Sequence, residues 1–436
     1  MPTPITRGAA SALSFGFLSV SKTRWITFGT ATFSSVSSKL DASLNLVNVT
    51  YAGNNESPIY KIGNDGIVGY RARKYSSSGN FGYDTNAVAV DTSTGYTWTA
   101  GLFSNYFSFS YFGLIAAYDS SNNLALIKYV NNTAYAPYTD IKVSGSNIVV
   151  CGDYLDTGTF TYGVHVGVLT KSTGLYSLSR ILTSATELYS RAVTVDGSGN
   201  IYALGTLSTF ATATYIFKYN SSMVLQWQTA MTSTKPTDIT TDSSGDVYIC
   251  ADNSVQKFNS SGTLQWQRTI ATGVAYRSVA FSKLTIDSSN NIYAVGTMTD
   301  TQSTTYYYAV IVKYNSSGTL QWTRVLYRSS GSNPQVFGNA ISIDNTNGNF
   351  YISGKDTGGP YLLTAKLPID GTLTGSYSQA SPAVTYTYSD PGWTDAAGAF
   401  TQTTPTFTDA AGTTAQATPT SPASQNLTNP FYKLPV

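Results

Sequence analysis

Apolar and β-branched residues alternate with polar residues in short runs along most of the chain, and turns rich in Asp, Asn, Ser and Gly separate the runs. A period of two residues places successive side chains on opposite faces of a strand. The run–turn–run unit therefore predicts β-hairpins. An Asp opens each turn, where its carboxylate can accept backbone N–H groups, and Gly or Asn suits the left-handed position. Clear copies cover residues 192–205, 238–250, 284–296 and 340–354.

A second hairpin follows the first and is nearly identical in residues 218–227, 257–266 and 313–322. Each of these copies begins with Lys, turns at Asn-Ser-Ser and ends at Trp. Two consecutive hairpins make a four-stranded meander, and a repeated meander is typical of β-propeller blades. Weaker first hairpins cover residues 58–68, 87–98 and 141–151, and weaker second hairpins begin at Lys39, Lys74, Ala117, Leu169 and Lys366.

Eight second hairpins and seven complete first hairpins can be counted in this way. From Lys39 to Lys366 the mean period is about 47 residues, close to that of a propeller blade. We expect the missing first hairpin to be split between the termini, with residues 24–29 and 383–390 as its two strands, so that the ring closes. An all-β propeller of eight blades over residues 23–390 is therefore favoured. Seven blades is the alternative, because the step from Lys39 to Lys74 is short.

The two hairpins resemble the β-propeller repeats known as SBBP repeats. The resemblance is carried by the halves Asp-x-Ser-Gly-Asn-Ile-Tyr-x-x-Gly and Lys-Tyr-Asn-Ser-Ser-Gly-Thr-Leu-Gln-Trp, and it is strong from about Ala192 to Leu326. It implies a propeller fold. It implies no reaction, because that family is a scaffold found in secreted, surface and viral proteins.

The composition indicates an exposed protein with few charges. Charged residues make up 11% of the chain and aromatic residues 13%, with 33 Tyr, whereas charged residues usually reach about 25%. The net charge of +2 provides no basic field for nucleic acid, and no apolar run is long enough to span a bilayer. Cys151 and Cys250 end equivalent hairpins two repeats apart, so we expect buried free thiols rather than a disulfide.

The two termini differ from the repeats. Polar residues interrupt the apolar stretch within residues 1–22, which argues against a signal peptide. Residues 391–436 are rich in Thr, Ala, Pro and Ser and carry no charge between Asp409 and Lys433, so they cannot form a core alone. A disordered tail and an arm ordered by neighbouring subunits are both consistent with this composition. We predict two extended attachment arms, 1–22 and 391–436.

The opening residues 5–17 are similar to the starts of structural proteins from tailed bacteriophages. A virion protein is assembled in the host cytoplasm and released by lysis, so it reaches an extracellular environment without an export signal. This origin reconciles the exposed-looking composition with the absence of a clear signal peptide.

The sequence offers little for catalysis or metal binding. His165 alternates with valines and is expected to be a structural imidazole, and one His with two distant Cys excludes the usual zinc sets. No Gly-x-Ser-x-Gly elbow, Walker loop or dinucleotide fingerprint is present. Calcium-like spacing of oxygen groups occurs at residues 196–200 and 242–246, without a downstream bidentate Glu. We therefore expect no cofactor, metal or catalytic residue.

Carboxylate chemistry remains an open alternative, because a glycosidase needs only two acids. The candidates are regularly spaced, which favours turn capping over catalysis, since a catalytic residue is unique within a repeat. The turn 315–322 is similar to the Asp box of sialidases but lacks its acid and is one residue too long before Trp322. The candidate acids are Asp91, Asp196, Asp242, Asp287 and Asp344.

The binding residues are unknown from the sequence, although residues 106–112 and 305–308 are dense in aromatic side chains that can stack on sugars. Packing between blades is the competing explanation for them.

We predict a non-enzymatic structural component of a phage virion, on the tail, neck or capsid. It would contact other virion proteins through its arms and form a homo-oligomer in a symmetric particle. The alternatives are a host-recognition adhesin or lectin that binds cell-surface glycan, which could be extracellular or on a cell surface, and a propeller glycoside hydrolase.

Overall fold

A computed structural model describes residues 25–435, except for 30–33, 52–58, 65–67, 72, 77–80, 106–109, 131–136, 157, 185–186, 208–212, 233, 303, 331–334, 358–360, 381–382, 399–401, 404–407, 412–415, 418–422 and 427–430. Every regular element in these ranges is a β-strand. The N-terminal arm predicted for residues 1–22 lies outside them.

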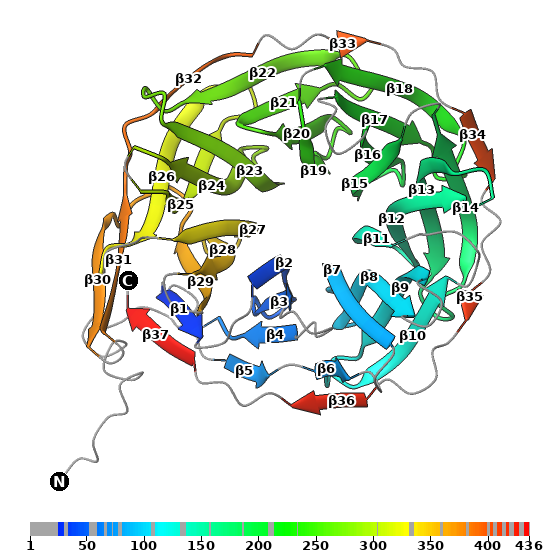
Figure 1. Cartoon of the computed structure of the whole chain (residues 1–436), viewed down its shortest axis with the longest axis horizontal. Coiled ribbons are helices and arrows are strands. Elements are labelled where there is room, and N and C mark those ends of the chain that lie inside the picture. Colours follow the sequence, from blue (N-terminus) through cyan, green and yellow to red (C-terminus); the bar gives the residue numbers. More distant parts are fainter. Residues whose placement is uncertain are drawn as a thin grey trace.

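Seven four-stranded antiparallel blades surround a central axis, with the first strand of each blade innermost (Figure 1). The predicted all-β propeller is therefore confirmed. The blades are numbered in chain order. Blade 1 contains β2 (Ser34–Leu40), β3 (Leu46–Tyr51), β4 (Ile59–Ile62) and β5 (Val68–Arg71). Blade 2 contains β7 (Phe81–Asp91), β8 (Tyr96–Asn105), β9 (Ser110–Tyr118) and β10 (Leu124–Val130). Blade 3 contains β11 (Tyr138–Ser144), β12 (Asn147–Asp156), β13 (Thr161–Thr170) and β14 (Tyr176–Thr183).

The remaining blades include those with the most regular repeats. Blade 4 contains β15 (Leu188–Val195), β16 (Ile201–Leu207), β17 (Ala213–Tyr219) and β18 (Leu225–Thr232). Blade 5 contains β19 (Pro236–Thr241), β20 (Val247–Ala251), β21 (Ser254–Phe258) and β22 (Leu264–Ala271). Blade 6 contains β23 (Arg277–Ile286), β24 (Ile292–Asp300), β25 (Tyr306–Tyr314) and β26 (Leu320–Arg328). Blade 7 contains β27 (Val336–Asp344), β28 (Asn349–Asp356), β29 (Tyr361–Pro368) and, as its fourth strand, β1 (Trp25–Gly29).

The favoured count of eight blades is wrong, and the alternative of seven is confirmed. The copy beginning at Lys39 is the first hairpin of blade 1, because Asp41 caps its turn through the N–H groups of Ser43 and Asn45, both 2.9 Å from Oδ1. The copy at Lys74 lies in β6 (Arg73–Ser76), whose one strand partner among the described residues is β36. One blade was thus counted as two.

The expected split of a first hairpin between the termini is also wrong, although an N-terminal strand does close the ring. In blade 7, Trp25 pairs with Lys366 in the register that pairs Trp227 with Lys218 in blade 4. Residues 25–29 therefore supply the last strand of a second hairpin. The strand β31 (Ala383–Ser389) pairs instead with β26 of blade 6 and with β30 (Gly375–Ala380).

The chain beyond blade 7 runs back around the outside of the ring and adds an outer strand to six of the seven blades (Figure 1). We call the strands β31 to β37 the belt. Six of them pair with the outer strands of blades 6, 5, 4, 3, 2 and 7, and β36 pairs with β6 beside blade 1. After β31 the belt consists of β32 (Thr394–Ala397), β33 (Gln402–Thr403), β34 (Thr408–Ala411), β35 (Gln416–Ala417), β36 (Ala423–Asn426) and β37 (Phe431–Pro435). The described parts of the predicted C-terminal arm, 391–436, thus pair with the chain's own strands.

The hydrophobic core lies between neighbouring blades. One cluster joins Val149 and Val166 of blade 3 to Val193 and Phe217 of blade 4. Another joins Tyr293 of blade 6 to blade 7. Because each sheet is buried on both faces, its central strands carry nearly continuous apolar runs.

A Trp–Gly contact joins blades 4 to 7 in succession. The Trp that ends the second hairpin of one blade covers the Gly in the corresponding turn of the next blade, and a Cβ on that Gly would lie 2.7–2.9 Å from the indole. The Gly residues have φ between +73° and +83°, where residues with a Cβ are disfavoured. The pairs are Trp227 with Gly262, Trp266 with Gly318, and Trp322 with Gly371.

Replacing Gly318 with Ala should destabilise the ring more than the same change at Gly273. Both residues have positive φ, but a Cβ at Gly318 would meet Trp266 at 2.7 Å, whereas none lies within 4 Å at Gly273. We expect a loss of about 1 kcal/mol at Gly273 from the backbone alone and roughly 2–4 kcal/mol at Gly318 with the added overpacking. Urea unfolding of both variants measures the difference. Equal losses would contradict the contact's role.

Truncation of residues 391–436 should make the ring prone to association. The deletion removes the strands that pair with β22, β14 and β1, among others, and unpaired outer edges are templates for pairing with another chain. We expect the truncated chain to be digested by protease faster than the full chain. We also expect its light scattering to rise with concentration more steeply than that of the full chain. A truncated chain that stays monodisperse and equally resistant would show that the belt does not protect the edges.

Candidate ligand-binding site

The regular blades place one lysine over one tyrosine beside each Trp. Lys218 Nζ lies 5.2 Å from the ring centre of Tyr202, and Lys257 lies 5.2 Å from Tyr248. Blade 6 repeats the arrangement with Lys313, 5.0 Å from its tyrosine ring. The Lys218 ammonium also donates to the Ser260 carbonyl of the next blade at 2.9 Å. Each lysine thus makes a cation–π contact within its blade, and Lys218 also bonds the next blade.

Blade 2 changes all three positions of this set. The strand register aligns Trp98 with the tyrosine, Ala117 with the lysine and Leu126 with the tryptophan, since Trp98 pairs with Ala117 and Ala117 with Leu126. The Gly contact is retained, because a Cβ on Gly174 of blade 3 would lie 2.8 Å from Leu126. The blades therefore pack as elsewhere, but two large side chains have been replaced by smaller ones.

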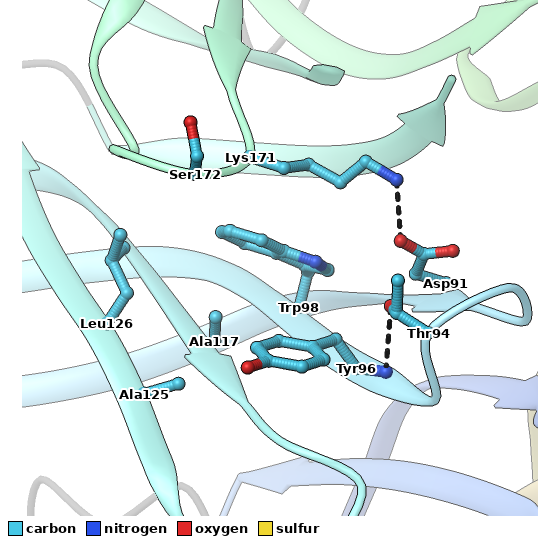
Figure 2. Close-up of a pocket in the computed structure, with 9 residues that line it drawn as sticks. All are labelled: Asp91, Thr94, Tyr96, Trp98, Ala117, Ala125, Leu126, Lys171 and Ser172. Atoms are coloured by element: carbon cyan, nitrogen blue, oxygen red, sulfur yellow. Dashed lines mark hydrogen bonds and ion pairs between the residues drawn. The ribbon is translucent and has the colours of Figure 1, made fainter. Parts of the chain in front are cut away.

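A cavity of about 370 Å³ occupies this region between blades 2 and 3. Its apolar lining includes Trp98, Tyr96 and Leu126, and its polar lining includes Asp91 and Lys171. Figure 2 shows the Trp98 indole between the side chains of Lys171 and Tyr96. We call this the Trp98 cavity.

An ion pair across the two blades borders the Trp98 cavity. Lys171 Nζ lies 2.5 Å from Asp91 Oδ2 (Figure 2), and the Ser93 hydroxyl and N–H donate to Asp91 Oδ1 at 2.6 and 3.1 Å. Burial alone would raise the pKa of Asp91, but the hydrogen bonds from Lys171 and Ser93 outweigh it and hold the pKa well below its usual range. The carboxylate is therefore charged and fixed in position.

The Trp98 indole contributes a polar group without a protein partner. Its side chain is 2% exposed, and Nε1 has no hydrogen-bond partner. In blades 4 and 5 the Nε1 atoms of Trp227 and Trp266 donate to carbonyls at 3.1 and 3.3 Å. An unpaired buried donor costs free energy.

A second cluster of charges lies on the innermost strands. Lys142 pairs with Asp140 at 2.6 Å and Lys283 with Asp238 at 3.3 Å. Burial and repulsion from Lys142 lower the pKa of Lys39 to about 8. The adjoining cavity is only about 20 Å³, so it holds no organic ligand. The backbone N–H of Val193 donates to Asp140 at 3.1 Å, which ties blade 3 to blade 4.

The candidate acids from the sequence lie in turns and cap them as predicted. Asp196 Oδ1 accepts the N–H groups of Ser198 and Asn200 at 2.9 Å, and Oδ2 accepts Asn200 Nδ2 at 2.8 Å. Its oxygens are thus committed to the turn rather than to a shared site. Asp242 and Asp287 accept the corresponding two N–H groups, and Asp344 accepts those of Thr346 and Asn347. Asp91 accepts the N–H of Ser93 with Oδ1 and pairs with Lys171 through Oδ2.

The calcium-like turns at 196–200 and 242–246 use their oxygens in the same way. Within the described ranges, no group of three or more His, Cys, Asp or Glu side chains could hold a metal ion.

Both cysteines are buried free thiols, as predicted. Cys151 and Cys250 occupy equivalent places, with Sγ 3.3 and 3.2 Å from a Thr hydroxyl. Burial raises the pKa of each thiol to about 12, which makes a reactive thiolate unfavourable.

The aromatic segments serve mainly for packing where they are described. Tyr307 stacks on Phe337 with ring centres 4.5 Å apart, and Tyr308 contacts Tyr327 at 5.1 Å. They belong to β25 rather than to an exposed loop. Residues 106–109 lie outside the described residues, and Phe112 packs against Phe103.

Sequence reasoning missed Trp98, Tyr96 and Lys171. A signal was present, because the hairpin at 87–98 carries Trp where the strong copies carry Tyr, and the paired copy carries Ala117 where they carry Lys. Only the strand register shows that these departures meet at one interface.

No protein-family model and no curated protein matches this chain. Among solved structures, the Dos1 propeller aligns with a TM-score of 0.50 at 10% identity, over 79% of this chain and 94% of that one. A protein of unknown function from Bacteroides caccae aligns with a TM-score of 0.40 at 12% identity, over 69% and 93%. A gluconolactonase from Xanthomonas campestris aligns with a TM-score of 0.37 at 12% identity, over 78% and 88%. The Dos1 likeness supports the propeller fold alone. Among the described residues, no helix is long and apolar enough to cross a membrane.

His165 is buried, in agreement with the structural role expected from its sequence. It is fully buried in β13, with Nε2 2.7 Å from the Ser179 hydroxyl and the ring 5.4 Å from that of Tyr176. Nδ1 has no hydrogen-bond partner. Burial lowers the pKa of the imidazole to about 4, because the charged form loses its hydration.

Acid should destabilise the protein through this single histidine. The folded pKa of His165, about 4, lies below the unfolded value near 6.5, so its contribution is fully present above pH 6.5 and is lost as the pH falls toward 4. We expect a loss of about 2 kcal/mol between pH 7.5 and pH 5. Urea unfolding at both pH values, compared with His165→Gln, measures it.

Asp153 changes the free energy of unfolding with pH in the opposite direction, and the comparison with His165→Gln cancels this contribution. Burial raises the pKa of Asp153 to about 6, and this group adds stability at low pH in both proteins. The same pH dependence in both proteins would contradict the assignment to His165.

Proposed function

We propose that this protein is a non-enzymatic structural component of a phage virion that displays its propeller outward from the tail, neck or capsid. The observation that supports this role best is the belt, which covers the outer strands of blades 2 to 7. From β32 to β37 the belt strands are only two to five residues long, and such short edge strands resist pairing with other chains, which suits a protein that stays exposed after release from the cell.

Two sequence features point in the same direction. The surface turns are built from Ser, Thr, Asn and Gly with few charges, and the repeats resemble SBBP-type scaffolds. Residues 5–17 are similar to the starts of tailed-phage structural proteins. In this proposal, residues 1–22 and part of 391–436 contact other virion proteins in a symmetric homo-oligomeric assembly.

The regular Asp residues favour a binding or structural role over a glycosidase. Hydrolysis of a glycosidic bond needs two carboxyl groups that face one substrate. Asp196 and Asp287 each use both oxygens within their own turn, and the neighbouring copies lie one blade apart.

One feature favours the second candidate, a host-recognition adhesin or lectin. The Trp98 cavity combines aromatic faces with a fixed ion pair, and Trp and Tyr are well suited to stacking on sugar rings. A virion protein and an adhesin are compatible roles, since a particle must attach to its host.

Immunogold electron microscopy should locate the protein on virus particles. Antibodies raised against the full chain would be applied to particles purified by density gradient from lysed cultures of the source, with pre-immune serum as the control. We expect gold on particles and peptides of this chain in the particle fraction. Protein confined to cell envelopes or culture medium, with none on particles, would contradict the virion role.

A further inference from the structure

We propose that the Trp98 cavity binds one neutral pyranose residue of a glycan. The proposal rests on the second candidate function, a glycan-binding adhesin, and it assigns the site and the ligand class. The role of the protein in a virion does not depend on it.

The cavity results from a coordinated change in the repeat. In blades 4 to 6, a Tyr, a Lys and a Trp together fill the space against the next blade. Blade 2 has a larger aromatic side chain at the first position and smaller side chains, Ala117 and Leu126, at the other two. The interface is otherwise preserved at Gly174. A structural interface gains nothing from such an exchange, since a space of about 370 Å³ forfeits packing energy.

The lining matches the two kinds of surface on a pyranose. The ring faces carry C–H groups, which pack against aromatic side chains, and the edges carry hydroxyls. Trp98 and Tyr96 supply aromatic surface, and Thr94 and Ser172 supply hydroxyls. The volume lies at the lower end of the roughly 300–1,000 Å³ range of small-molecule sites, which favours one sugar residue over an extended oligosaccharide.

Two polar groups can recognise hydroxyls directly. Lys171 and Asp91, 2.5 Å apart, place a donor beside an acceptor, which suits two neighbouring hydroxyls on one ring. Ser93 fixes the carboxylate from behind, so the pair is preorganised for binding.

The charge of the cavity favours a neutral sugar. Lys171 and Asp91 cancel each other, so neither a sialylated or sulfated sugar nor an organic cation finds a net opposite charge. An organic cation could otherwise imitate the ammonium that covers Tyr202 in blade 4. In blade 2 the Lys171 ammonium already lies on the cavity wall (Figure 2), and it would repel a second cation.

A glycan array with the full chain, carrying neutral, sialylated and sulfated glycans, identifies the ligand. Isothermal titration then uses the corresponding free monosaccharide, with choline chloride as the cationic probe. We expect binding of a glycan that presents a neutral terminal pyranose, and no heat from choline.

The blocking variant is Ala117→Lys, which restores the residue of the regular repeats and places it over the aromatic ring. The regular blades accommodate this lysine, so the variant should fold, with a melting temperature lowered by repulsion from the Lys171 ammonium, and lose affinity by more than about tenfold. Lys171→Met should weaken binding through lost hydrogen bonds. Ala396→Lys, on the exposed outer strand of blade 5, adds the same charge elsewhere and should bind as the unmodified chain does.

The outcomes separate this site from the adhesin function. Glycan binding that Ala117→Lys leaves unchanged would overturn the Trp98 cavity as the site while the adhesin role survives. Binding of choline or of acidic sugars alone, blocked by Ala117→Lys, would overturn the neutral-sugar assignment. An array without any bound glycan would overturn both the adhesin role and this proposal, and would leave the virion role untouched.

Discussion

The ring depends on contacts between neighbouring blades, in which side chains of one blade pack on and bond to a turn of the next blade. The left-handed glycine at Gly262 or Gly318 leaves room for an indole, and the indole N–H then bonds a carbonyl of the same turn. Arg268 adds a bond to the Gly318 carbonyl at 2.8 Å. These bonds satisfy turn carbonyls that would otherwise be covered without partners. The contact is directional, so each blade fixes the position of its neighbour and the meanders form a ring rather than a stack of independent sheets.

The same arrangement explains where a new site can arise in such a protein. The contact of Gly174 with the Leu126 side chain holds blade 3 against blade 2 without the large side chains that fill the interfaces between blades 4 and 7. An exchange such as Ala117 for lysine therefore opens space without loosening the ring. Repeat proteins can vary one interface independently because each unit contacts mainly its neighbours.

The propeller could be predicted from the sequence because its signals are local. Alternation within strands, Asp-capped turns and the Lys-to-Trp hairpin all lie within a few residues of one another. The sequence could not show where the first blade begins. Asp41 caps a turn equivalent to that of Asp196, but the residues around Asp41 also resemble the second hairpin. The belt and the role of Trp25 were missed for a different reason. Both depend on pairing between residues hundreds of positions apart, for which an alternating pattern specifies a strand but not its partner. The Trp98 cavity depends likewise on which strands lie side by side.

The pairing of β1 with β37 has a consequence for biosynthesis. Trp25 is among the first described residues to leave the ribosome, and it pairs with Lys366 on one side and Pro435 on the other. β1 therefore gains its two partners only after β29 and β37, far later in the chain, have been translated. Contacts of such long sequence separation form slowly, so we expect the closure of the ring through β1 to be a late step of folding.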